Sequence, residues 1–171
     1  MAPAFRSAGD RWVGISGRAR VVVYSTERLD VVDLPDSIFD LTDPQWRGRV
    51  GWAPMNGSFQ SFITAMRQIH GEERTLQWLR AMIDNEVQEF PSNTPIVQAV
   101  ADDEIVLGLV NHYYLFRFLA EDPDFPAANT YTDPGEAGAI INIAGIGLLA
   151  PSADNIAAQR FIAYLLESPA Q

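Results

Sequence analysis

Apolar residues follow two different spacings along the chain, and the change from one to the other predicts an α/β fold. Short apolar runs rich in β-branched residues predict buried strands at residues 19–24, 49–53 and 105–110. Apolar residues spaced three or four positions apart predict amphipathic helices that begin near residues 58, 72, 93, 115 and 153. Strands that alternate with helices predict a mixed, mostly parallel sheet flanked by helices.

The first two helices have well-marked apolar stripes, and we expect these stripes to face the core. In the first helix, Ser58 is the expected N-cap, and the stripe comprises Phe59, Phe62, Ile63, Met66 and Ile69. In the second helix, the expected stripe comprises Leu76, Leu79, Met82 and Ile83.

Charge and composition exclude several classes of function. The 171 residues carry a formal net charge of −10, which argues against a nucleic-acid partner and against an anionic membrane surface. The chain contains no Cys, so disulfides and thiolate metal sites are excluded. The opening residues lack the apolar stretch of a signal peptide.

Two adjacent tyrosines, Tyr113 and Tyr114, follow the predicted strand at residues 105–110. Ligands of open α/β sheets gather beyond the carboxyl ends of strands. Phenolate is a hard oxygen donor of the kind that a hard cation such as ferric iron prefers. The alternative is that both tyrosines are amphipathic packing residues. We interpret the neighbouring His112 as a residue turned away from the pair rather than as a ligand.

A second polar group, Asn56-Gly57-Ser58, stands where a strand passes into a helix. Backbone N–H groups and the positive end of the helix dipole make such a junction suitable for an anion. The same three residues are also common in turns and N-caps, so both interpretations stay open. Asn93, at another helix start, has the same two interpretations. No nucleotide-binding or nucleophile motif is present, and no acid/base pair is evident.

Taken in order, five stretches resemble the ferric-ion-binding proteins of bacterial ABC importers, which have the type 2 periplasmic-binding-protein fold. These stretches are residues 16–21, 40–50, 56–59, 111–114 and 158–161, and the resemblance extends over residues 12–171. It implies one lobe of that fold and a binding function rather than an enzyme.

The resemblance also implies roles for individual residues. Tyr113 and Tyr114 match the two phenolate ligands of ferric iron. A synergistic anion, such as phosphate or carbonate, is expected at Asn56, Gly57, Ser58, Asn93 and Asn111.

From the resemblance we also expect a division of the chain into three parts. Residues 1–23 form an N-terminal extension with a strand that crosses the hinge, and residues 24–138 form the ligand-binding lobe. Residues 139–171 are the return crossing and a remnant of the other lobe. We therefore expect a piece of a longer polypeptide with an export signal, whose missing lobe completes the iron site.

The resemblance implies a partner and a location as well. The full-length protein is expected to be periplasmic, or extracellular and lipid-anchored, and to deliver iron to an ABC permease in the inner or cytoplasmic membrane. The 171-residue piece is expected to self-associate. The alternatives are a lobe for phosphonate, thiosulfate or polyamine, a small α/β enzyme that uses a tyrosine as acid/base, or a structural module.

Overall fold

The structure, a computed structural model, describes residues 5–170 and divides the chain into two units. The larger, Ala19–Ile140, is termed the compact unit; the smaller, termed the outer unit, takes the described residues on either side of it. The compact unit begins five residues before the expected start at 24 and ends two residues after the expected end at 138. Residues 1–4 and 171 lie outside the described part of the chain.

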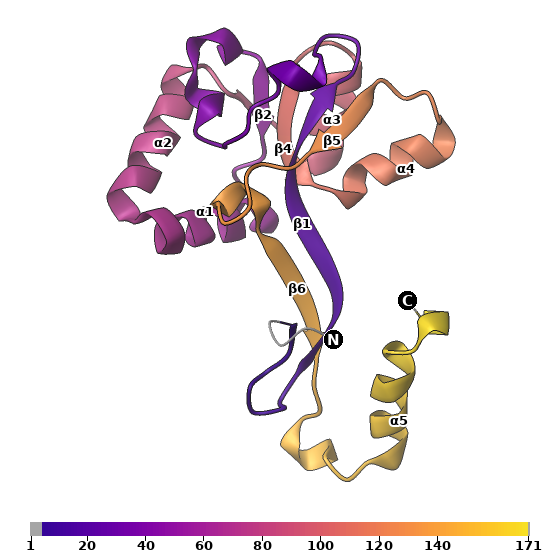
Figure 1. Ribbon diagram of the computed structural model, residues 1–171. Coiled ribbons are helices and arrows are strands. Elements are labelled where there is room, and N and C mark those ends of the chain that lie inside the picture. The colour runs from indigo at the N-terminus through magenta and orange to yellow at the C-terminus, as the bar shows by residue number, and fades with distance from the viewer. Residues whose placement is uncertain (1–4, 171) are drawn as a thin grey trace. The chain divides into compact units, whose positions relative to one another are not determined.

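Five strands form the sheet of the compact unit, in the order β3-β2-β4-β1-β5 (Figure 1). β1 (Val13–Ser25) runs antiparallel to β4 (Leu107–Asn111) and to β5 (Ala127–Thr130). β2 (Val50–Trp52) runs parallel to β4 and to β3 (Gln88–Glu89). The expected mixed sheet is confirmed. In the compact unit, the two strand pairs that involve β1 are antiparallel and the two that involve β2 are parallel.

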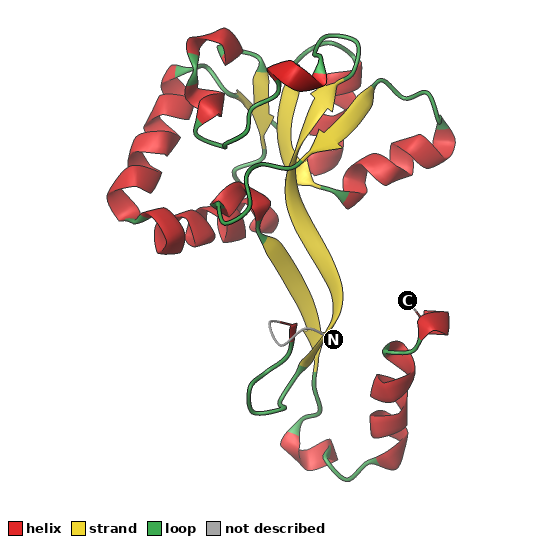
Figure 2. Cartoon of the chain, in the orientation of Figure 1, coloured by secondary structure: helices red, strands yellow, loops and turns green. Residues whose placement is uncertain are grey.

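Helices cover both faces of this sheet (Figure 2). α1 (Gly57–His70) and α2 (Glu72–Asp84) lie on one face, and α3 (Asn93–Ala101) and α4 (Tyr113–Glu121) lie on the other. Side chains of β1 alternate between the two resulting cores, as the two-residue period of a strand requires. Val22 and Tyr24 belong to the core under α1 and α2, whereas Val21 and Val23 belong to the core under α3.

Part of the predicted helix stripes is wrong. Ile69, Leu76 and Ile83 are exposed by 49%, 44% and 62%. Trp78 and Thr75 are buried instead. The indole of Trp78 donates to the carbonyl of Ile38 at 2.8 Å, so its large ring packs inward with its polar atom satisfied. That partner lies 40 residues away, and the spacing of apolar residues carries no information about it.

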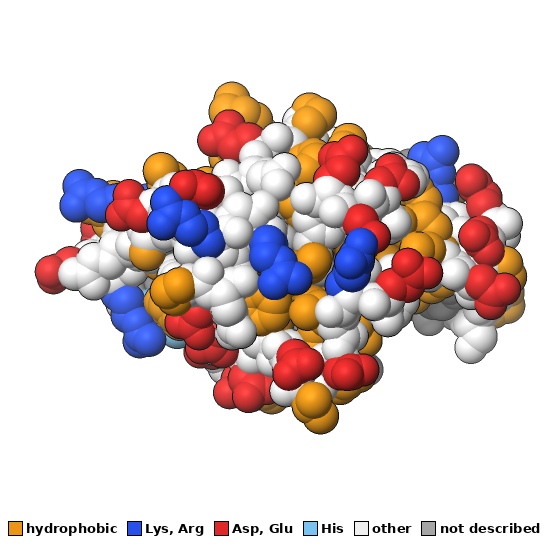
Figure 3. Space-filling view, turned by 90° about the horizontal axis from the view of Figure 1, so that it is seen from above, with side chains coloured by type: hydrophobic (Ala, Val, Ile, Leu, Met, Phe, Trp, Pro, Cys, Tyr) orange, Lys and Arg blue, Asp and Glu red, His pale blue; other side chains and the backbone are white. Residues whose placement is uncertain are grey.

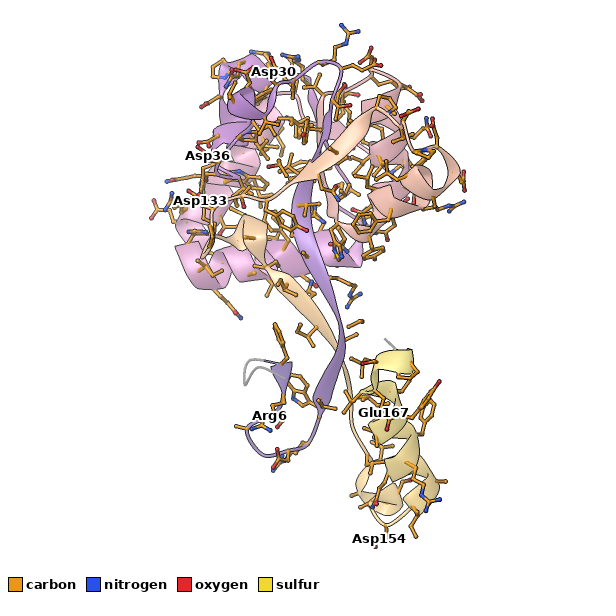
Figure 4. All side chains as sticks on the ribbon, turned by 45° about the vertical axis from the view of Figure 1, so that its right-hand side comes forward. Arg6, Asp30, Asp36, Asp133, Asp154 and Glu167 are labelled. Atoms are coloured by element: carbon orange, nitrogen blue, oxygen red, sulfur yellow. The ribbon has the colours of Figure 1, made fainter. Side chains whose placement is uncertain are left out.

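The connections of the compact unit contain short 3₁₀ turns, at Val31–Asp33, Asp40–Thr42, Pro44–Trp46 and Ala137–Ala139. The segment after β1 is tied to the segment after β5, because the N–H of Asp133 donates to the carbonyl of Asp36 at 2.8 Å. Figure 4 shows these two residues close together. The long connection after β1 is therefore held against the body of the unit.

The outer unit contains β6 (Ile141–Ile146), which pairs with β1, and α5 (Ile156–Leu165). Short 3₁₀ turns lie at Ala150–Ser152 and Ser168–Ala170. No described residue of α5 is buried, and Ile156, Phe161 and Tyr164 are exposed by 64%, 57% and 49%. Amphipathic helices of globular proteins normally bury their apolar face. The apolar face of α5 is therefore open in this unit.

Acidic and basic side chains are interspersed over the face in Figure 3. None of the helices in the described part of the chain is long and apolar enough to cross a membrane.

Candidate functional site

Three helices begin at one edge of the sheet. β3, β2 and β4 are adjacent and parallel, so their carboxyl ends lie at the same edge. Each is followed by a helix: β2 by α1, β3 by α3 and β4 by α4. The positive ends of three helix dipoles therefore gather at the edge where α/β proteins bind ligands. All seven residues singled out in the sequence lie at these strand–helix junctions or in the first turns of these helices.

The tyrosine pair opens helix α4. Tyr113 and Tyr114 are its first two residues, and their rings are stacked, with centroids 4.5 Å apart and planes inclined by 28°. Tyr113 is 38% exposed and Tyr114 is half-buried. Two phenols this close can present two oxygens to one hard cation.

The anion-type junction has a different cap from the one expected. The N-cap of α1 is Asn56, not Ser58. Oδ1 of Asn56 accepts from the backbone N–H of Ser58 at 2.9 Å and from its hydroxyl at 2.7 Å. Asn competes with Ser for N-cap positions, which spacing alone could not resolve. Gly57 stands at the first helical position, and a Cβ built there meets nothing within 4 Å.

The two remaining asparagines are buried at the same edge. Asn93, the first residue of α3, is 1% exposed, and its amide nitrogen lies 3.5 Å from the hydroxyl oxygen of Ser58. Within the described residues, Oδ1 of Asn93 meets no hydrogen-bond partner. Asn111, the last residue of β4, is 3% exposed. The fold thus brings Asn93 and Ser58 together from two different helices.

Sequence reasoning missed one residue of this region, Arg20. It pairs with Asn111 in the sheet and is 2% exposed. Its Nη2 donates to the carbonyl of Leu109 at 2.8 Å, while Nε and Nη1 have no partner among the described residues. Its guanidinium carbon lies 5.6 and 5.3 Å from the ring centres of Phe59 and Phe62. Burial lowers the pKa of Arg20 to about 9.

A buried cation without a carboxylate is costly, so Arg20 marks a place where negative charge is favourable. The available signal was a charged residue inside an otherwise apolar strand, between Ala19 and Val21. Phe59 directly follows Ser58, so the positive charge of Arg20 lies under the first turn of α1.

Carboxylate and imidazole metal sites are not evident in the described residues, where no group of three or more His, Asp or Glu could hold a metal ion. The two phenols are the groups of this edge that can bind a hard cation as anionic oxygen donors. His112 is not turned away from the pair as expected, because its ring stands edge-on to that of Tyr113, with centroids 5.7 Å apart.

An open α/β sheet with clustered helix N-termini and polar side chains at one edge has the arrangement of a ligand-binding α/β domain. The chain belongs to the family of bacterial extracellular solute-binding proteins, which it matches over residues 4–171. Its fold is that of type 2 periplasmic-binding proteins.

Several curated relatives of the chain are named as iron-binding or iron-uptake proteins. It is 34% identical, over 95% of its length, to the Fe(3+)-binding periplasmic protein of Serratia marcescens. Its structure is similar to iron-bound HitA from Pseudomonas aeruginosa, with 29% identity, a TM-score of 0.87 and coverage of 99% of this chain and 55% of that one. It is also similar to Trichodesmium IdiA (FutA) in complex with iron and citrate, with 26% identity and a TM-score of 0.84. That match covers 97% of this chain and 55% of the IdiA chain.

These relatives are binding proteins rather than enzymes. The chain spans about half the length of the curated relatives it matches, with 48% of the Serratia protein covered.

Proposed function

We propose that this chain is the anion-bearing lobe of a ferric-iron-binding protein, with Tyr113 and Tyr114 as iron ligands. The observation that carries the proposal is the stacked tyrosine pair at the edge where three helices begin. Each phenol loses its proton when it binds, because a bound cation lowers the pKa of its ligand. The two phenolates together neutralise two of the three positive charges of the ion.

The same edge is proposed to hold the synergistic anion. Gly57 leaves room for an anion against the backbone, and the hydroxyl of Ser58 and the amide of Asn93 supply donors. Asn111 lies opposite Arg20 in the sheet, and the buried charge of Arg20 favours an anion over a neutral ligand. Phosphate and carbonate both fit this chemistry.

An anion at this position has to replace the hydrogen bonds between Ser58 and Asn56. Oδ1 of Asn56 holds both donors of Ser58 in the structure. We propose that the arriving anion takes over these donors and that the side chain of Asn56 turns outward.

The remaining ligands are proposed to come from a second lobe. Ferric iron takes about six hard donors, and two phenolates with one anion leave positions to fill. Relatives about twice as long as this chain provide a second half that can close over the metal by a hinge motion. We propose that the whole protein works in the periplasm and delivers iron to an ABC permease.

Visible absorption tests the proposal. Adding a ferric chelate to the whole protein, with its second lobe, is expected to produce a phenolate-to-iron charge-transfer band, which Tyr113→Phe or Tyr114→Phe weakens. Tyr164→Phe is the matched control, because Tyr164 is 49% exposed and lies on α5 of the outer unit. A band of equal strength in all four proteins contradicts the proposed ligands.

A further inference from the structure

His112 is the residue at which strand β4 turns into helix α4. The residue before it, Asn111, still pairs with Arg20 of β1. His112 itself is helical, with φ −53° and ψ −35°. Its N–H donates to the carbonyl of Ala19 at 3.0 Å, as in a regular antiparallel pair. In such a pair, the N–H of Ala19 would bind the carbonyl of His112 in return.

The imidazole of His112 takes the place of that carbonyl. The N–H of Ala19 donates to Nδ1 of His112 at 3.1 Å. The carbonyl of His112 instead accepts from the side-chain amide of Asn129, on β5, at 2.9 Å. The backbone of His112 is therefore held by β1 and by β5 at the point where α4 begins.

The ring of His112 connects this anchor to the tyrosines. It lies edge-on to Tyr113 and to Phe116, with centroids 5.7 and 5.8 Å away. Tyr113 in turn stacks on Tyr114. The ring whose Nδ1 binds Ala19 therefore also contacts the first ring of the pair.

We propose that His112 is a positioning residue for the tyrosine pair: its Nδ1 bond to Ala19 fixes the first turn of α4 and the stacked arrangement of Tyr113 and Tyr114. The inference rests on the proposed function. Ala19 is the first residue of the compact unit. The bond therefore ties the tyrosine pair to β1 at the place where this strand enters the unit.

Three variants separate positioning from stability. His112→Phe keeps an aromatic ring but removes the acceptor for the Ala19 N–H. His112→Asn restores an acceptor, because Oδ1 of Asn and Nδ1 of His stand the same number of bonds from the backbone. Ile105→Val removes one methylene from a core residue that is 1% exposed, and it controls for a loss of stability while the imidazole of His112 and the N–H of Ala19 stay unchanged.

The first readout needs no metal. In protein labelled with fluorotyrosine, the ¹⁹F resonances of Tyr113 and Tyr114 are assigned with the two Tyr→Phe variants. The Tyr114 resonance is expected to shift in His112→Phe and to stay in place in His112→Asn and Ile105→Val. The Tyr113 resonance should shift in both His112 variants, because both replace the imidazole ring beside it. Unchanged resonances in His112→Phe would overturn the inference. Equal shifts in Ile105→Val would also overturn it, because His112 would then act only through the stability of the protein.

The second readout uses the whole protein and ferric iron added as its nitrilotriacetate complex. Release to a competing chelator is expected to be about tenfold faster from His112→Phe, the loss that one hydrogen bond explains, and unchanged in His112→Asn. If the unmodified protein gives no charge-transfer band, the proposed function fails, while the ¹⁹F result still decides the role of His112. A normal band with equal release from all variants contradicts positioning.

Discussion

Arg20 sets the electrostatics of the binding edge at the scale of single residues. Burial holds its folded-state pKa at about 9, well below the ordinary value of a guanidinium. Between these two values the unfolded chain binds more protons than the folded one, so the contribution of Arg20 to stability rises with pH there. Below pH 9 its buried charge is a constant cost. A charge kept at such a cost is consistent with a role in anion binding.

Arg20→Met tests this role. At pH 7 the free energy of unfolding of the variant is expected to be about 1–4 kcal/mol higher than that of the unmodified protein, because a buried cation is replaced by an apolar side chain. The advantage should shrink above pH 9, where Arg20 begins to lose its charge in the folded state. Denaturant unfolding between pH 7 and 10 checks both expectations, and calorimetry should show weaker phosphate binding. A variant less stable at every pH, with unchanged phosphate affinity, contradicts the role.

Replacing Gly57 or Gly108 by Ala is expected to have different effects on the stability of the protein. A Cβ at Gly108 would lie 2.2 Å from Cγ2 of the buried Ile96, so Gly108→Ala should destabilise the protein by about 1–3 kcal/mol or more. A Cβ at Gly57 meets nothing within 4 Å, so Gly57→Ala should leave stability unchanged or slightly raised.

The methyl group of Gly57→Ala nevertheless stands where an anion would approach the backbone. Phosphate affinity is expected to fall by about tenfold, the loss of one charge-assisted hydrogen bond. Thermal unfolding and phosphate calorimetry on both variants distinguish the effects. If Gly57→Ala keeps full phosphate affinity, the anion does not bind at the start of α1.

At the scale of elements, strands and helices of this chain are readable from apolar spacing, but their partners are not. The buried runs at residues 19–24, 49–53 and 105–110 correspond to β1, β2 and β4, and the predicted helices are present. The direction of β1 was not predictable, because it depends on hydrogen bonds to β4 and β5, more than 80 residues later in the chain. The burial of Trp78 depends in the same way on a distant carbonyl.

The candidate site was predictable to the same degree. Strand–helix junctions mark its residues in the sequence, and helix starts favour anions for local reasons. Arg20 could not be assigned, because its burial depends on Phe59 and Phe62 of another element. The role of Asn56 as the N-cap was missed because two neighbouring residues have similar capping preferences.

The cap of α1 offers a test in which the helix stays intact. Asp and Ser cap helices about as well as Asn, so Asn56→Asp and Asn56→Ser should both keep stability within about 0.5 kcal/mol. Asn56→Asp adds a negative charge beside Ser58 and should abolish or strongly weaken phosphate binding. Asn56→Ser is the uncharged control and should keep it. Equal phosphate affinity in the two variants would show that no anion binds near this cap.

At the scale of the whole molecule, the two units differ in how completely they bury apolar residues. The compact unit has two cores with members exposed by 8% or less. In the outer unit, Ile156, Phe161 and Tyr164 of α5 remain exposed. Apolar patches of this kind are normally covered in soluble proteins. Relatives about twice as long contain additional chain that could cover this face.

Without such a cover, the chain is expected to self-associate through α5. Sedimentation velocity should show a concentration-dependent dimer or larger species, which Phe161→Glu reduces. Val32→Glu is the matched control, because Val32 is 90% exposed but lies in the compact unit. If Val32→Glu disperses the protein and Phe161→Glu does not, self-association uses a different face.

Iron location tests the central claim most directly. Crystals of the whole protein grown with ferric iron and phosphate would be measured at the iron absorption edge, and the anomalous difference map would locate the metal. We predict a peak bound by the hydroxyl oxygens of Tyr113 and Tyr114, with phosphate between the iron and the start of α1 at Gly57 and Ser58. Iron bound by surface carboxylates, with both tyrosine oxygens outside its coordination sphere, would contradict the claim.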